Sequence, residues 1–202
     1  MNSRRILELG GIAAGVIMVA FGIGSLVLGI NARNTVGDEL KREFIVGSPD
    51  MNPTETEKAV QEAGLTDVTI PSCDVAEKEI KTGSDARCFA QYMRIHALES
   101  SGGLTYAQMG RFVAAADPND PAGTSDEESA AKDESGEPIS NNARNTWVTE
   151  TALSTALNVS YMAEQIALFS VVVGIALLLS GIGFIILALA VLGGSARKPA
   201  AG

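Results

Sequence analysis

Histidine is almost absent from this sequence: His96 is the only one among 202 residues. Common zinc sites and non-haem iron sites need more nitrogen or sulfur ligands than one histidine and two cysteines supply. Neither Cys73 nor Cys88 has a histidine close to it in the sequence, and no glycine-rich loop has the form that binds phosphate. We therefore predict no catalytic residue, no metal ligand and no cofactor, and we expect a non-enzymatic protein in which His96 is structural.

Basic residues are also few, since 15 Lys and Arg stand against 24 Asp and Glu. The excess is concentrated between residues 31 and 160, where 22 side chains are acidic and 11 are basic. Nucleic acids and anionic lipid headgroups both require a basic surface on the protein that binds them. We therefore expect no nucleic-acid partner, and no binding of this region to anionic lipid.

Charge is missing from two long apolar runs. Residues 6–30 contain one charged residue, Glu8, and residues 166–192 contain none. Both runs exceed the roughly 20 apolar residues that a helix needs to cross a bilayer. We predict two transmembrane helices surrounded by membrane lipid. The first run is too long for a signal peptide and no A-x-A site follows it, so we expect a retained anchor.

The basic residues that flank these runs predict the orientation. Arg4 and Arg5 precede the first run, Arg197 and Lys198 follow the second, and only Arg33 lies close to a run on the other side. The positive-inside rule then places both termini in the cytoplasm. The predicted fold is all-α: two transmembrane helices (6–30 and 166–192) form an antiparallel hairpin, with cytoplasmic tails at 1–5 and 193–202 and a small helical extracytoplasmic domain at 31–165.

The two cysteines lie in the predicted extracytoplasmic region, where an oxidising compartment lets a disulfide persist. A bridge between Cys73 and Cys88 would contribute about 3 kcal/mol by the chain-entropy estimate. Two buried free thiols are the alternative. We predict the disulfide.

Helical periodicity and capping residues predict the elements between the apolar runs. The first span is predicted to continue as a helix through Val36, Leu40 and Phe44, and a helix capped by Asn52 and ended by Gly64 follows. Further helices are predicted at 73–81, at 84–101 with Ser84 as its cap, and at 104–117. A last helix runs from Asn145 into the second span and places Trp147 in the domain core. Residues 117–142 carry eight acids and three prolines, which predicts a solvated, mobile loop without EF-hand spacing.

Small residues recur in both apolar runs at alternating spacings of four and three. In lipid, small residues on one helix face let two backbones approach closely. We predict a helix-packing seam, either within one chain or between chains. Its members are Gly11, Gly15, Gly22, Ser25 and Gly29 in the first run, and Ser170, Gly174, Gly181 and Ala188 in the second. The same stripe includes Leu177 and Phe184.

The segments "HALESSGGLTYAQMGRF" and "NARNTWVTETALSTALNVSYMAEQIALFSVVVGIALLLSGIGF" resemble a family of uncharacterised two-span membrane proteins of high-GC Gram-positive bacteria. Some members carry the label aromatic ring-opening dioxygenase. A non-haem iron triad needs two histidines and a carboxylate, and this chain has one histidine. The resemblance thus implies a topology and a bacterial envelope, and it implies no activity or site residue.

These observations predict a structural or accessory subunit of an assembly in the bacterial plasma membrane, with a protein partner or a second copy of the chain. Two alternatives remain open. One is a ligand-sensing extracytoplasmic module that acts through a partner, because the predicted cytoplasmic tail is too short to transduce a signal alone. The other is an oligomeric two-span channel, which the lack of polar residues in the spans disfavours.

Overall fold

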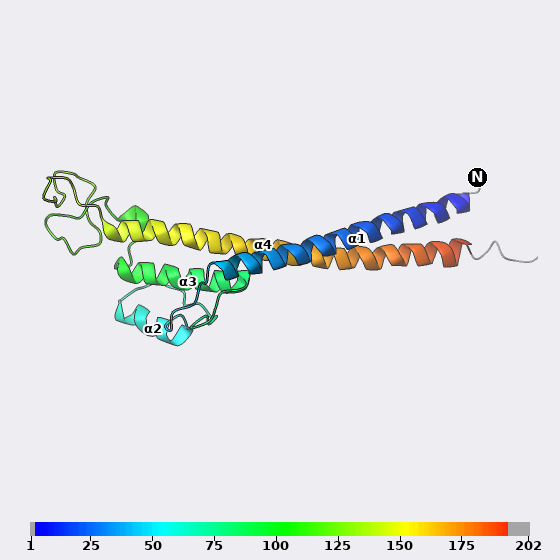
Figure 1. Cartoon of the computed structure of the whole chain (residues 1–202), viewed down its shortest axis with the longest axis horizontal. Helices are drawn as coiled ribbons and strands as arrows, with labels where there is room; N and C mark the ends of the chain where they lie inside the picture. The colour runs from blue at the N-terminus through cyan, green and yellow to red at the C-terminus, as the bar shows by residue number, and fades with distance from the viewer. Residues whose placement is uncertain (1–2, 194–202) are drawn as a thin grey trace, which may run out of the picture. The chain divides into compact units, whose positions relative to one another are not determined.

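The computed structural model describes residues 3–193, and its regular structure is entirely helical (Figure 1). The all-α class is thereby confirmed, since β-pairing in residues 3–193 is limited to isolated bridges. The elements are α1 (Ser3–Arg42), α2 (Pro53–Glu62), α3 (Gly83–Ser100), the 3-10 turn η1 (Tyr106–Gln108), α4 (Asn142–Leu187) and the π-helical η2 (Ala188–Gly193). Most of the predicted C-terminal tail, with Arg197 and Lys198, lies outside the described residues.

The chain divides into two compact units. The first contains the residues up to Thr35 and those from Ala163 onward, and the second contains Val36–Met162. The apolar runs lie in the first unit, in α1 and α4. Only 11% of the most apolar stretch of α1 and 17% of that of α4 is buried, so neither resembles the core helix of a soluble protein. Two helices are therefore long and apolar enough to span a membrane, as predicted.

The second unit, which we call the helical domain, is built around α3. Its main apolar cluster joins Leu40 of α1, Ile80, Tyr92 of α3 and Leu157 of α4, and the side chains of Ile80 and Tyr92 are fully buried. A smaller cluster contains Ala97, Met109 and Trp147. Burial of Trp147 agrees with the prediction that it belongs to the domain core.

The predicted ends of α2 are confirmed. Asn52 caps the helix by accepting a hydrogen bond from the backbone N–H of Glu55 at 3.0 Å, and Pro53 is the first helical residue. Gly64 follows the last turn with a φ of +64°, the left-handed conformation that favours glycine at this position.

The continuation of α1 is confirmed for Val36 and Leu40, which pack in the main cluster, and it is wrong for Phe44. The helix ends at Arg42. The N–H groups of Glu43 and Phe44 bond to the carbonyls of Leu40 and Lys41, which tightens the last turn, and Phe44 has a φ of +51°. Its side chain points into solvent and is 82% exposed.

The helix predicted at 73–81 is absent. The backbone of this segment instead pairs with residues 45–47, through bridges between Val46 and Glu79 and between Gly47 and Ala76. Because this pairing already satisfies its backbone groups, the segment does not need a helix. The N-cap of α3 is Thr82 in a capping box with Asp85, and Ser84 is the second residue of the helix.

The helix predicted at 104–117 is also absent beyond η1. Residues 110–115 pair with the acidic stretch, through bridges from Phe112 to Thr124 and to Ser140 and from Ala114 to Ala130. At Gly110 a Cβ atom would collide with the backbone of Thr124, so two backbones meet where only glycine fits. The acidic stretch is thus hydrogen-bonded to its neighbours, and its mobility stays a prediction.

Helix α4 begins at Asn142, three residues before the predicted start at Asn145. The earlier start is explained by the buried Asn141, which caps the helix and which the sequence pattern did not single out. Its Oδ1 accepts the N–H of Ala143 at 3.1 Å, and its Nδ2 donates to the carbonyls of Gly110 at 3.1 Å and Pro121 at 2.9 Å. One side chain therefore caps the helix and fastens the acidic stretch at both ends.

Candidate functional site

In the first unit, glycines of α1 lie against the backbone of α4. A Cβ atom on Gly22 would lie 2.9 Å from the carbonyl oxygen of Gly174, and one on Gly174 would lie 2.8 Å from that of Gly22. Gly15 and Gly181 face each other in the same way, at 2.6 and 2.7 Å. Real Cβ atoms essentially never approach other atoms within 3.0 Å, so both pairs of positions require glycine.

The contacts pair the two helices in opposite order along the chain. A Cβ atom on Gly29 would lie 2.7 Å from the carbonyl oxygen of Ala167, and one on Gly11 would lie 3.1 Å from the Cβ of Ala188. Along α1 the contacting glycines at 15, 22 and 29 are seven residues apart. The same spacing separates residues 167, 174 and 181 of α4 and residue 188, the first of η2. A seven-residue repeat keeps one face of each helix toward the other when the pair winds with a left-handed twist.

The predicted seam also contains two serines. Ser25 and Ser170 are half-buried, and the Ser170 hydroxyl donates to the carbonyl of Ile166 at 3.0 Å. On α4 the side chains that reach the glycines of α1 are Val171, Leu178 and Ile185. Leu177 and Phe184 of the predicted stripe are not among the atoms nearest to these glycines. Two residues seven apart can be joined through a residue three or four positions after the first. The sequence pattern selected 174, 177 and 181, whereas the residues nearest to the glycines of α1 include 174, 178 and 181.

An ion pair lies next to these contacts. The Arg33 Nε is 3.5 Å from the Glu164 Oε1, and the side chains are 54% and 11% exposed. Both residues lie just beyond the predicted spans, where a charged pair avoids the hydrocarbon core.

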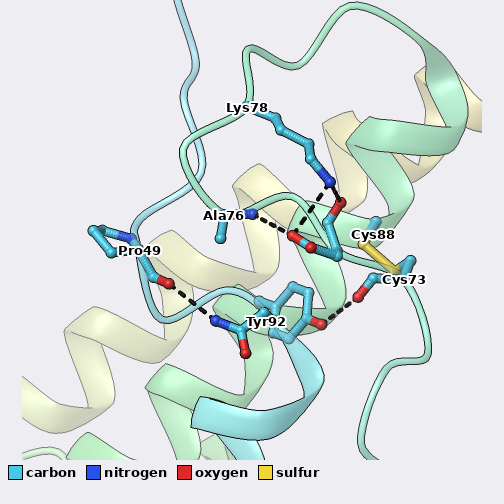
Figure 2. Close-up of polar contacts among 8 residues, drawn as sticks. Pro49, Cys73, Ala76, Lys78, Cys88 and Tyr92 are labelled. Carbon is cyan, nitrogen blue, oxygen red and sulfur yellow. Dashed lines mark hydrogen bonds and ion pairs between the residues drawn. A yellow bond between two sulfur atoms is a disulfide. The ribbon is translucent and has the colours of Figure 1, made fainter.

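Cys73 and Cys88 are joined by a disulfide with a Cα–Cα distance of 6.1 Å, which agrees with the prediction (Figure 2). The buried Tyr92, one turn along α3 from Cys88, donates its hydroxyl proton to the Cys73 carbonyl. Burial, with a smaller contribution from the nearby carboxylate of Asp74, raises the pKa of this hydroxyl. The bridge and the hydrogen bond together fasten the irregular segment before α3 to that helix.

The single histidine lies close to a carboxylate. The His96 Nε2 lies 3.1 Å from the Asp50 Oδ2, which links α3 to the segment before α2. The pKa of Asp50 is lowered, mainly by the hydrogen bond from Ser48 and further by His96. One helical turn on, Glu99 has a buried Oε1 with no hydrogen-bond partner among the described residues, and burial raises its pKa.

Among residues 3–193, no three or more His, Cys, Asp and Glu side chains are arranged to hold a metal ion.

An apolar groove of about 550 Å³ lies within the helical domain, and sequence patterns did not reveal it. Leu40 and Ile45 form one wall, and α3 contributes Phe89 and Met93. The lining residues from α4 are Leu153, Ala156, Leu157 and Ser160. Glu39 and Glu43 also line it. The groove is formed by segments more than a hundred residues apart, so only the fold assembles it.

A second cavity, of about 750 Å³, lies between residues 64–72 and α3. Its lining is more polar and includes Gln91 and Arg94. The Arg94 guanidinium lies 5.1 Å from the centre of the Trp147 ring, within the range of a cation–π contact.

The chain matches no protein-family model, no curated protein and no solved structure. The features that bear on its function are the glycine contacts between α1 and α4 and the apolar groove.

Proposed function

We propose that this protein is a two-span integral membrane protein of the bacterial plasma membrane, with cytoplasmic termini and an extracytoplasmic helical domain. In this proposal the two spans form an antiparallel hairpin held by the glycine contacts. The protein acts as a structural or accessory subunit of a membrane assembly and catalyses no reaction.

One observation carries the proposal. The apolar parts of α1 and α4 turn their glycines toward each other and their large side chains outward, so that Phe21, Leu28, Phe169 and Leu179 are exposed. In water such a surface would aggregate, whereas in a bilayer it is the favourable arrangement. Both helices need a lipid or protein environment along their full apolar length.

A retained first span is supported by the far end of α1. The helix runs without a break from the apolar run to Arg42, and Leu40 in its last turn is buried in the core of the helical domain. Removal of the apolar run as a signal peptide would leave a short helical stub to fill that position in the core. Because the same helix contains the apolar run and a core residue of the helical domain, we infer that the apolar run is not cleaved off.

The accessory role is supported by the chemistry of the helical domain. Its single histidine lies against the Asp50 carboxylate, and its two cysteines are bonded to each other. A ligand-sensing role is the second candidate, because the cavity beside residues 64–72 offers the Arg94 guanidinium and the Gln91 amide to a polar ligand.

The test has two steps on one preparation. Membranes that contain the tagged chain are extracted at alkaline pH, and the pellet is then solubilised in mild detergent for size-exclusion mass measurement. We expect the chain in the pellet, and then in a complex of fixed stoichiometry. Release of the chain at alkaline pH would refute membrane integration, and a bare monomer in detergent would refute the subunit role and favour ligand sensing.

A further inference from the structure

Phe44 is held in a conformation that a bulky residue rarely adopts. Its φ of +51° lies in the left-handed region, where a residue with a large side chain is strained by its own Cβ. The strain is not compensated by burial, because 82% of the side chain is exposed. An aromatic ring fixed in water at the end of a 40-residue helix suits an anchor for a partner.

The residues on either side of Phe44 in the sequence line the apolar groove described above. These residues are Glu43 and Ile45, while Phe44 itself does not line the groove. Its walls include the half-buried side chains of Phe89 and Met93. An exposed aromatic side chain therefore lies next in sequence to residues that line an open apolar groove.

We propose that the occupant of the groove is Phe44 of a second copy of this chain, and that the two copies exchange these side chains reciprocally. The contact is isologous, with the same surface on both copies, as in a two-fold dimer. The proposal rests on the membrane location proposed above and names the partner in the assembly.

Membrane topology favours this occupant over an unrelated segment. Two copies that cross the bilayer in the same direction hold any given residue at the same depth. Because Glu43 and Ile45 line the groove, the Phe44 of a neighbouring copy arrives at the depth of the groove. A two-fold axis along the membrane normal then brings both anchors to both grooves.

Charge also favours a second copy. Lys41 and Arg42 end α1 beside Phe44, and Glu39 and Glu43 line the groove. Among the described residues, Lys41 pairs with Asp38 and Arg42 pairs with Glu39, which itself lines the groove, and the two basic side chains are 52% and 73% exposed. Such exposed pairs contribute little and exchange readily. An incoming Lys41 or Arg42 therefore meets Glu43 of the receiving groove, and Arg42 can exchange its own Glu39 for the Glu39 of the other copy.

The test is cross-linking between two chains that carry different tags. One chain carries Phe44→Cys, the other carries Met93→Cys, and both are expressed together and oxidised in isolated membranes. Since the native cysteines are bonded to each other, the introduced thiols are the free ones. We expect a covalent dimer that carries both tags. The control replaces Phe44→Cys by Val148→Cys, an exposed site on α4 outside the groove lining.

A dimer with both tags that forms no faster than the Val148→Cys control would overturn the inference. If the chain remains in the membrane at alkaline pH in that case, the proposed function still stands. Release of the chain at alkaline pH would instead refute the proposed function itself.

A second variant separates binding from folding. Phe44→Gly removes the anchor, and glycine adopts a positive φ without strain, so the fold should be retained. Loss of an aromatic anchor is expected to weaken dimerisation about thirtyfold, measured by energy transfer between labelled chains on dilution into excess lipid. Unchanged dimerisation of Phe44→Gly would contradict the proposal.

Discussion

At the scale of single residues, the helical domain depends on a few side chains that link distant segments. Asn141 joins the start of α4 to Gly110 and Pro121, and Tyr92 joins α3 to the carbonyl of Cys73. Each link satisfies a backbone group that irregular structure would otherwise leave unpaired. These residues allow irregular segments to pack in a domain that consists of α2, α3 and η1 together with the end of α1 and the first part of α4.

The disulfide gives the first prediction. Cys73 and Cys88 are separated by 15 residues, and a loop of this size is worth about 3 kcal/mol. We expect the double variant Cys73→Ser/Cys88→Ser to unfold at a lower temperature, with a loss of that size in the free energy of unfolding. Trp147, the only tryptophan, is buried in the domain core, so its fluorescence reports this unfolding.

The control for this prediction is the native protein with and without reductant. Intact mass should increase on alkylation only after reduction. Alkylation of the unreduced protein would show that the bridge does not form.

Glu99 gives a prediction about pH. Burial raises its pKa in the folded protein, so the folded state binds this proton more tightly than the unfolded chain. The ionised carboxylate therefore lowers stability above the raised pKa, and this penalty disappears below the ordinary carboxyl pKa near 4. We expect Glu99→Gln to stabilise the domain at pH 7 by less than about 1 kcal/mol, because partial exposure to solvent screens the charge.

The measurement compares thermal unfolding of Glu99→Gln and the native protein from pH 7 down to about pH 4. The difference between them should shrink as the pH falls. An advantage of Glu99→Gln that stays constant with pH would show that ionisation of Glu99 is not its cause.

At the scale of elements, the glycines of α1 differ sharply in their surroundings. A side chain at Gly22 would collide with the backbone of Gly174, whereas no described residue lies within 4 Å of a Cβ atom on Gly24. We expect Gly22→Leu and Gly174→Leu to destabilise the pair of helices by about 2 kcal/mol through overpacking. Gly24→Leu, two residues away on the same helix, should have little effect.

The readout is the temperature at which the detergent-solubilised protein loses its size-exclusion peak. Gly183→Leu is the matched control on α4, since no described residue lies near its Cβ position either. Equal melting temperatures for Gly22→Leu and Gly24→Leu would disprove the proposed role of the glycine contacts.

Prediction from sequence succeeded for elements whose signal is local. The cap at Asn52 and the stop at Gly64 depend on neighbouring residues, and the long apolar runs need only composition. It failed at 73–81 and 104–117, where segments with helical composition find backbone partners elsewhere in the chain. Tertiary pairing decided these segments, and a periodicity read from a single sequence does not contain that information.

The same limit applies to the candidate sites. Spacings of four and three located the glycines at 15, 22, 29, 174 and 181, because close backbone approach requires small residues and these recur regularly. The groove had no such signal. Its walls come from three helices and a turn, and the left-handed conformation of Phe44 is set by the tight end of α1.

At the scale of the whole molecule, the proposed topology is tested by a single introduced cysteine. The native cysteines form a bridge, so Glu127→Cys in the exposed acidic stretch adds the only free thiol. We expect an impermeant maleimide to label it in intact cells, because the proposed topology places the helical domain outside the cytoplasm. Ser3→Cys, at the start of α1, should react only after the membrane is permeabilised.

The reverse pattern, in which Ser3→Cys reacts in intact cells and Glu127→Cys does not, would invert the topology. Labelling of both sites in intact cells would be incompatible with a pair of complete spans.

Because the main cluster of the helical domain joins Leu40 to Leu157, its core cannot close until α4 has been synthesised. At about 5–20 residues per second, the intervening chain occupies the ribosome for several seconds or more. Cys73 and Cys88 are both made in the first half of that interval and are close in sequence, so their bridge can form before the core does. With the proposed topology, the segment that contains both cysteines is translocated first and its disulfide forms next, while the helical domain still lacks its last helix.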